Sequence, residues 1–192
     1  MAKLYFYYSS MNAGKSTTLL QADFNYRERG MQTMLWTAAL DDREDAGWIS
    51  SRIGLKKKAH VFDDATDMLS EISAEHETGA LDCVMIDEAQ FLSKDQVFQL
   101  ALVADQLKIP VLAYGLRTDF QAALFQGSAQ LLAIADELVE LKAVCECGSK
   151  STMNMRVDQD GNPVLAGQQT AIGGNELYVA LCRKHFMEKL NG

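Results

Sequence analysis

Proline, long apolar runs and positive charge are all scarce in this sequence of 192 residues. With two prolines and no biased tract, it cannot be a collagen-like, linker-like or disordered chain. No apolar stretch approaches about 18 residues, which excludes a transmembrane helix. Residues 1–8 lack the apolar core and cleavage site of a signal peptide. We therefore expect a cytoplasmic protein without a membrane partner, built as one domain or one domain with a small appendage.

Basic residues are outnumbered, because 18 Lys and Arg stand against 26 Asp and Glu, for a net charge of −8. Nucleic-acid-binding proteins usually carry a basic face. We therefore expect no nucleic-acid partner and a protein that handles small molecules. The four cysteines would be reduced in the cytoplasm, so they need a role other than disulfide formation.

Apolar segments alternate with amphipathic segments along residues 1–144. Strands are expected at residues 4–8, 33–38, 81–86, 110–115 and 137–144, and helices at 15–29, 64–77, 93–107 and 128–135. This alternation predicts an α/β fold with a parallel sheet flanked by helices on both faces. Residues 40–58 are polar and include a run of three lysines at 56–58, which predicts a long solvated loop.

The character of the sequence changes after Cys145. Residues 152–157, a turn at 158–162 and residues 164–169 predict a β-ribbon, and a glycine-rich loop follows at 172–175. We therefore predict two domains, an α/β domain at residues 1–144 and a small C-terminal domain at residues 145–192.

The segment from Ser9 to Ser16 matches the phosphate-loop pattern except at its first position, where the pattern has glycine. It follows an expected strand and opens an expected helix, which is the context that the motif requires. Backbone N–H groups of such a loop and the helix N-terminus bind phosphates. Lys15 would then reach the β- and γ-phosphates of ATP, and Ser16 would bind Mg²⁺.

A second nucleotide motif is formed by the apolar residues 84–86, which end in Asp87 and Glu88. Asp87 would hold Mg²⁺ directly or through water. Glu88 can act as a general base toward an attacking hydroxyl or water. The alternative is a solvated strand end, which would leave Mg²⁺ without its carboxylate partner. The predicted nucleotide contacts are Ser9, Ser10, Met11, Asn12, Ala13, Gly14, Lys15, Ser16, Asp87, Glu88, Ala89 and Gln90.

Four potential metal ligands occur as two close pairs, Cys145 with Cys147 and Cys182 with His185. Three thiolates and one imidazole without an open position are typical of a structural, tetrahedral zinc site. The alternative is buried free thiols and a surface histidine. Cys83 lies inside an apolar strand and is expected in the core. His60 and His76 have no ligand partner at useful spacing.

With these motifs the sequence closely resembles the cytosolic-type thymidine kinases in their bacterial form. The matching segments are residues 7–17, 41–43, 86–91, 114–120, 144–147, 172–175, 178–182 and His185. The departures are Ser9 in place of glycine, and a C-x-C pair with a histidine where other members use four cysteines. The resemblance implies a P-loop NTPase-like fold with a zinc-ribbon domain. It also implies phosphorylation of the 5′-hydroxyl of thymidine by ATP with Mg²⁺ and a structural Zn²⁺, feedback inhibition by dTTP, and a homotetramer.

The resemblance also implies roles for individual residues. Glu88 is implied as the general base, and Arg43 as a stabiliser of charge near the reacting phosphate. A lasso loop at residues 167–175 would fold over the base, and its glycines would let main-chain groups come close to thymine. The implied thymidine contacts are Met11, Phe91, Leu116, Phe120, Phe125, Ile172, Gly173, Gly174 and Tyr178.

Two other functions fit parts of the pattern. One is a phosphate-loop ATPase whose zinc ribbon binds nucleic acid or protein and whose Glu88 positions water. The balanced charges of residues 145–192 argue against it. The other is a binding module with a degenerate loop, suggested by Ser9. The argument against it is that Lys15, Ser16, Asp87 and Glu88 are all intact. ATP turnover with and without thymidine distinguishes the three.

Overall fold

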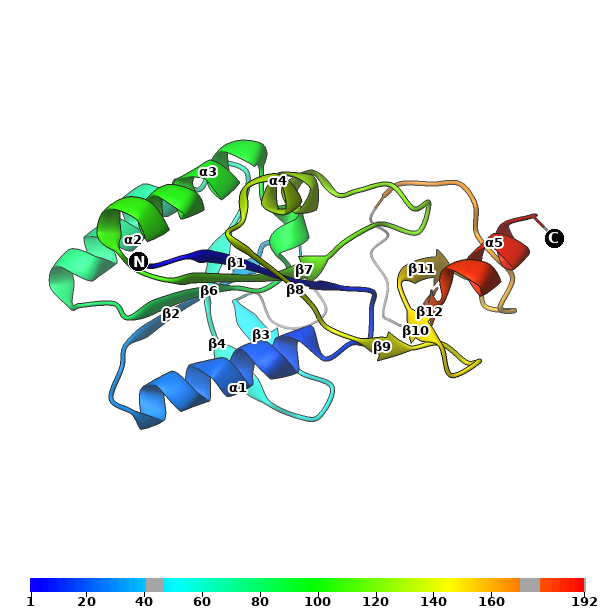
Figure 1. Cartoon of the computed structure of the whole chain (residues 1–192), viewed down its shortest axis with the longest axis horizontal. Helices are drawn as coiled ribbons and strands as arrows, with labels where there is room; N and C mark the ends of the chain where they lie inside the picture. The colour runs from blue at the N-terminus through cyan, green and yellow to red at the C-terminus, as the bar shows by residue number, and fades with distance from the viewer. Residues whose placement is uncertain (41–46, 170–176, 192) are drawn as a thin grey trace.

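The centre of the molecule is a parallel sheet, shown in Figure 1 by a computed structural model that describes residues 1–40, 47–169 and 177–191. The six strands follow the order β5-β2-β6-β7-β1-β8, and each neighbouring pair is parallel. Their bounds are Leu4–Ser9 (β1), Thr33–Ala38 (β2), His60–Phe62 (β5), Cys83–Ile86 (β6), Val111–Leu116 (β7) and Glu137–Glu140 (β8). The predicted α/β fold is confirmed.

Helices cover both faces of this sheet. In Figure 1, α1 (Lys15–Glu28) lies on one face, and α2 (Met68–Thr78), α3 (Lys94–Leu102) and α4 (Gln126–Ile134) lie on the other. A π-helical turn, Val103–Leu107, extends α3. Because successive strand residues point to opposite faces, the buried side chains form two clusters. Trp36 and Ile86 belong to the cluster under α2–α4, and Met85 and Tyr114 to the cluster under α1.

Local signals place several element boundaries. The Ser93 hydroxyl accepts from the Gln96 N–H, and the Gln96 side chain accepts from the Ser93 N–H, so the expected capping box starts α3. Gly30 adopts φ 78° just beyond α1, as a C-terminal stop requires. Among the helices of the described residues, none is long and apolar enough to cross a membrane.

The prediction of a loop over residues 40–58 is wrong for its described part. Trp48–Ser50 (β3) and Lys56–Lys58 (β4) form an antiparallel hairpin, and residues 41–46 lie outside the described residues. The hairpin is held because Ile49 is buried in the α1-side core and Lys57 forms an ion pair with Asp23 of α1. The adjacent strand β5 was also not expected.

The C-terminal region has its own small core. Met155 and Leu181 pack with the cysteines Cys145 and Cys182 and with Phe186, which is the buried residue of helix α5 (Arg183–Asn191). The expected ribbon is confirmed only next to its turn, where the Val164 N–H donates to the Arg156 carbonyl and Val157 forms an antiparallel bridge with Pro163. Beyond that point β11 (Met153–Arg156) pairs with β12 (Tyr178–Leu181) and not with residues 165–169. The reason for this pairing is that β12 contributes Leu181 to the small core, whereas residues 165–169 are exposed and contribute no buried side chain.

The expected strand at residues 137–144 is divided into two parts. Its first part is β8, and its second part is β9 (Ala143–Val144), which pairs with β10 (Lys150–Ser151). The β9–β10 pair crosses the predicted domain boundary after residue 144. The division into domains at residues 1–144 and 145–192 therefore stays a prediction.

Candidate functional site

A loop of five residues connects β1 to α1 and has the shape of a phosphate loop. Asn12 and Gly14 adopt φ values of 65° and 77°, and the left-handed conformation at Gly14 suits a residue without a side chain. Ser9 ends β1 and has no positive φ, so its backbone does not require glycine. The Ser9 hydroxyl accepts from Lys15 Nζ at 3.2 Å and donates to the Ser10 carbonyl at 2.7 Å. The departure from the motif at Ser9 therefore leaves the loop intact.

The carboxyl end of β6 brings Asp87 to the start of α1. The Ser16 hydroxyl donates to Asp87 Oδ2 at 2.8 Å, so the two predicted Mg²⁺ ligands are in contact. Burial, followed by the negative charge of Glu88, raises the pKa of Asp87 to about 7. A hydroxyl and a buried carboxylate beside a phosphate loop are a suitable donor set for Mg²⁺.

A hydrogen bond from Gln90 holds the side chain of Glu88 in place. It adopts φ 53°, which is uncommon for a residue other than glycine and typical of functional sites. Gln90 Nε2 donates to Glu88 Oε2, and Gln90 Oε1 accepts from the Leu116 N–H at 3.0 Å. Gly115 is needed there, because an added Cβ would lie 2.9 Å from the Gln90 N. Ala89 and Gln90 are both buried, and Gln90 joins Glu88 to β7 through its side chain amide.

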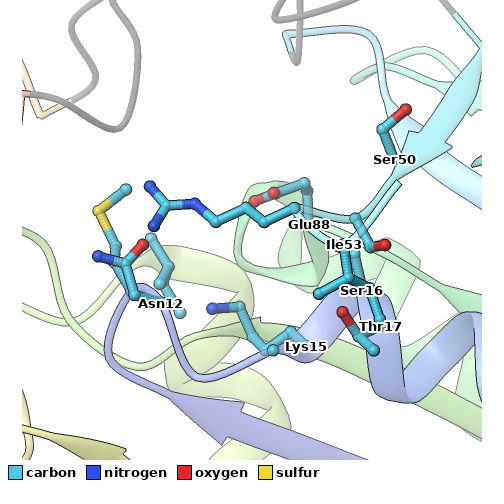
Figure 2. A pocket seen from close by; sticks show the side chains of 12 residues that line it. Asn12, Lys15, Ser16, Thr17, Ser50, Ile53 and Glu88 are labelled. Carbon is cyan, nitrogen blue, oxygen red and sulfur yellow. The ribbon is translucent and has the colours of Figure 1, made fainter. Parts of the chain in front are cut away.

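These groups surround a cavity of about 270 Å³. Figure 2 shows Asn12, Lys15, Ser16 and Glu88 around it, together with Ser50 and Ile53 of the hairpin segment. Predicted residues that line it are Met11, Asn12, Gly14, Lys15, Ser16, Glu88 and Leu116. The lining residues that sequence reasoning missed are Thr17, Ser50, Ser51, Arg52 and Ile53.

Only one of the missed residues could have been predicted from the sequence. Thr17 follows the motif directly and could have been included with it. The others lie at or next to the β3–β4 turn, and no motif in that segment indicates phosphate chemistry. Arg52 adds a second cation to the cavity besides Lys15.

Aromatic residues expected to contact thymidine gather in two groups. The rings of Phe91 and Phe125 meet edge to face at 5.9 Å. The Arg156 guanidinium lies 3.9 Å from the centre of the Phe120 ring, and it donates to the Tyr178 hydroxyl at 2.7 Å through Nη2. Sequence reasoning missed Arg156, which joins two of the expected contacts. The predicted site residues Arg43, Ile172, Gly173 and Gly174 lie outside the described residues.

The Cys/His residues meet as a four-ligand cluster. One ligand atom each from Cys145, Cys147, Cys182 and His185 lies within 4.8 Å of the others. Cys145 Sγ is 3.3 Å from His185 Nδ1, and Cys147 Sγ is 3.9 Å from Cys182 Sγ. Tetrahedral zinc–thiolate geometry gives separations of about 3.5–3.8 Å. Backbone N–H groups of Cys147 and Cys182 lower the pKa of the Cys145 thiol to about 6, which favours the ligating thiolate. The cluster therefore fits a structural zinc ion.

The remaining cysteine and histidines have structural roles. Cys83 is fully buried in β6, as expected for a core residue. His76 Nδ1 accepts from the Leu81 N–H at 3.0 Å. The ring centre of His60 lies 5.0 Å from that of Trp36.

Comparisons with known proteins show the family to which the chain is similar. The family model described as "Thymidine kinase" matches residues 2–186. A thymidine kinase of Novosphingobium aromaticivorans is 69% identical over 190 residues, covering 99% of both chains. A thymidine kinase of Zymomonas mobilis is 64% identical, and the match covers 100% of this chain and 99% of that protein. A thymidine kinase of Escherichia coli K12 is 58% identical, and the match covers 99% of this chain and 93% of that protein. The chain therefore belongs to the thymidine kinase family, a family of transferases.

Proposed function

We propose that the chain transfers the γ-phosphoryl group of ATP to the 5′-hydroxyl of thymidine. The observation that carries the proposal is the hydrogen bond from Ser16 to Asp87 at 2.8 Å, with Glu88 as the next residue along the chain. This contact joins the phosphate loop to the carboxylates within a member of the thymidine kinase family. Such an arrangement supports phosphoryl transfer by positioning and charge stabilisation.

The phosphates of ATP would lie against the loop between β1 and α1. Lys15, which now contacts Ser9 and Ser10, would turn toward the β- and γ-phosphates. Arg52 lines the same cavity and would add a second positive charge. Ser16 and Asp87 would hold Mg²⁺, which when bound supplies positive charge against the transferring phosphoryl group.

Glu88 would take the proton from the 5′-hydroxyl as the oxygen attacks the γ-phosphorus. Its partner Gln90 donates to Oε2, so the orientation of the carboxylate is fixed before substrate binds. Preorganisation of this kind reduces the reorganisation needed in the transition state. Ala89 and Gln90, expected as nucleotide contacts, would then act by supporting Glu88.

Thymidine would bind beside Met11 and Leu116, with Phe91, Phe120, Phe125 and Tyr178 around it. Arg156 supports this assignment because it contacts both Phe120 and Tyr178. Recognition of the base by the lasso loop, charge stabilisation by Arg43, inhibition by dTTP, a homotetramer and a cytoplasmic location rest on the family resemblance and belong to the same proposal. Zn²⁺ would hold the C-terminal region together through its four ligands.

The experiment is a phosphoryl-transfer assay with labelled ATP and a panel of nucleosides. We expect labelled dTMP and little ATP hydrolysis without thymidine. Glu88→Gln should lower kcat by about 10²–10⁴-fold and leave ADP and thymidine binding intact, because glutamine has the same shape but cannot accept the proton. Glu77→Gln, an exposed substitution on α2, is the matched control. ATP hydrolysis that ignores thymidine, or a Glu88→Gln kcat within threefold of the parent, would contradict the proposal.

A further inference from the structure

Asn154, on β11 in the C-terminal region, uses both ends of its side chain amide. Its Oδ1 accepts from the Met11 N–H at 2.7 Å, and its Nδ2 donates to the Thr118 carbonyl at 2.9 Å. The side chain is buried, with 2% of the residue exposed. Met11 belongs to the phosphate loop and Thr118 to the segment that follows β7. One buried amide therefore joins two parts of the site to the C-terminal region.

The peptide between Ser10 and Met11 is fixed at both ends. Its N–H donates to Asn154, and its carbonyl accepts from the Ser9 hydroxyl at 2.7 Å and from Lys15 Nζ at 3.3 Å. N–H groups of a phosphate loop usually point to the phosphates. Here the Met11 N–H donates to Asn154 instead. The orientation of the Ser10–Met11 peptide, whose carbonyl contacts Lys15, therefore depends on a residue outside the motif.

A second contact ties the same part of the loop to the C-terminal region. Ser10 Oγ lies 2.9 Å from Ser151 Oγ, and Ser151 Oγ donates to the Leu181 carbonyl at 3.3 Å. Both serines are 3% exposed. This contact holds the Ser10 side chain, but it does not satisfy the Met11 N–H, which has its acceptor in Asn154.

We propose that Asn154 is a positioning residue that keeps the phosphate loop in its nucleotide-binding conformation. The loop contains two left-handed residues, Asn12 and Gly14, so its conformation is not fixed by regular structure and needs tertiary contacts. Removing the acceptor leaves a part-buried N–H unpaired, and the peptide can turn to find another partner. This inference rests on the proposed nucleotide site, and it assigns Asn154 no contact with substrate.

The test compares two variants that separate the ends of the amide. Asn154→Leu removes both hydrogen bonds, whereas Asn154→Asp retains an acceptor for Met11 and loses the donor to Thr118. We expect Asn154→Leu to weaken Mg·ADP binding about tenfold, equal to about 1.4 kcal/mol, as measured by calorimetry. Asn154→Asp should bind Mg·ADP within threefold of the parent and raise the KM for thymidine more than the KM for ATP. Asn162→Leu, in an exposed turn of the same region, is the control.

Hydrogen exchange at the Met11 amide gives a readout that a general loss of stability would not reproduce. Exchange should become faster in Asn154→Leu, with the core amides of β1 and β7 unchanged and the thermal midpoint showing a folded protein. Unchanged Met11 exchange, or equal loss of Mg·ADP affinity in the Leu and Asp variants, would overturn the inference. If the parent binds Mg·ADP but does not phosphorylate thymidine, the proposed function fails, and the binding pattern of the variants still decides the role of Asn154.

Discussion

Gly127, the second residue of α4, is in close contact with the turn that carries Glu88. A Cβ atom at this position would lie 2.5 Å from the Ala89 carbonyl, 2.8 Å from that of Leu92 and 2.9 Å from that of Gln90. All three atoms are backbone, so no flexible side chain can move away. We therefore predict that Gly127→Ala destabilises the protein and lowers its activity.

The magnitude follows from two opposing effects. Ordinary contacts of a Cβ atom begin at 3.4 Å, so the helix and the turn must separate by most of the difference between 2.5 and 3.4 Å. Overpacking of this kind costs roughly 1–3 kcal/mol. Alanine gains about 1 kcal/mol over glycine in an exposed helix. Because three rigid contacts act together, we take the upper end of the overpacking cost, about 3 kcal/mol. Subtracting the gain of about 1 kcal/mol from alanine leaves an expected net loss of about 2 kcal/mol.

Thermal unfolding and turnover measure the two consequences. For a chain of this size, a loss of 2 kcal/mol lowers the melting temperature by roughly 4–8 °C. Displacement of the Glu88 turn should lower kcat about tenfold or more, since errors of 1 Å can cost a hundredfold. Gly79→Ala is the control, because its added Cβ meets nothing within 4 Å and the φ of Gly79 is −168°. A melting temperature and a kcat equal to those of Gly79→Ala would refute the reasoning.

Three further perturbations test other parts of the structure. Burial raises the pKa of Asp23, but hydrogen bonds from Lys57, Thr33 and Arg27 outweigh it and hold that pKa below its ordinary value. The ionised Asp23 therefore stabilises the folded protein above about pH 4, and this stabilisation is lost as the pH falls. The free energies of urea unfolding of the parent and of Asp23→Asn should differ by about 2 kcal/mol at pH 7 and become equal in acid. A difference that does not change with pH would contradict this. Arg52→Gln should raise the KM for ATP about tenfold, as expected for loss of a charged contact of about 1.4 kcal/mol. The control Arg29→Gln should leave this KM unchanged. Equal KM values in the two variants would show that Arg52 does not contact the phosphates. Cys182→Ser should abolish stoichiometric zinc binding in metal analysis, because it removes one of four ligands. The control Cys83→Ser should retain one zinc per chain. Equal metal contents in the two variants would show that the cluster is not the zinc site.

Elements with local signals could be predicted from the sequence. The strand at Thr33–Ala38 follows from a short, mostly apolar run, and the start of α3 follows from its capping box. The phosphate loop and the pair Asp87–Glu88 follow from motifs. In each case the information lies within a few neighbouring residues.

Elements that depend on distant contacts could not be predicted. The β3–β4 hairpin has short strands with exposed lysines, and its anchor is the pairing of Lys57 with Asp23, which no local pattern shows. The partner of β11 is β12 because Leu181 completes the small C-terminal core. Asn154 and Arg52 belong to no motif, because their roles come from contacts between segments far apart in the sequence.

The position of β1 between β7 and β8 in the sheet has a consequence for biosynthesis. Leu4 pairs with Val111, 107 residues later, and Tyr5 pairs with Glu137. At roughly 5–20 residues per second, the ribosome needs about 5–20 s after making β1 before its first partner strand emerges. During that time an aromatic strand with unpaired edges is exposed, which is the type of segment that chaperones bind and that aggregates. Because its strand pairings are so non-local, folding should also be slow, and the nascent chain could form its nucleotide site only after β7 has been made, since Leu116 lines the cavity.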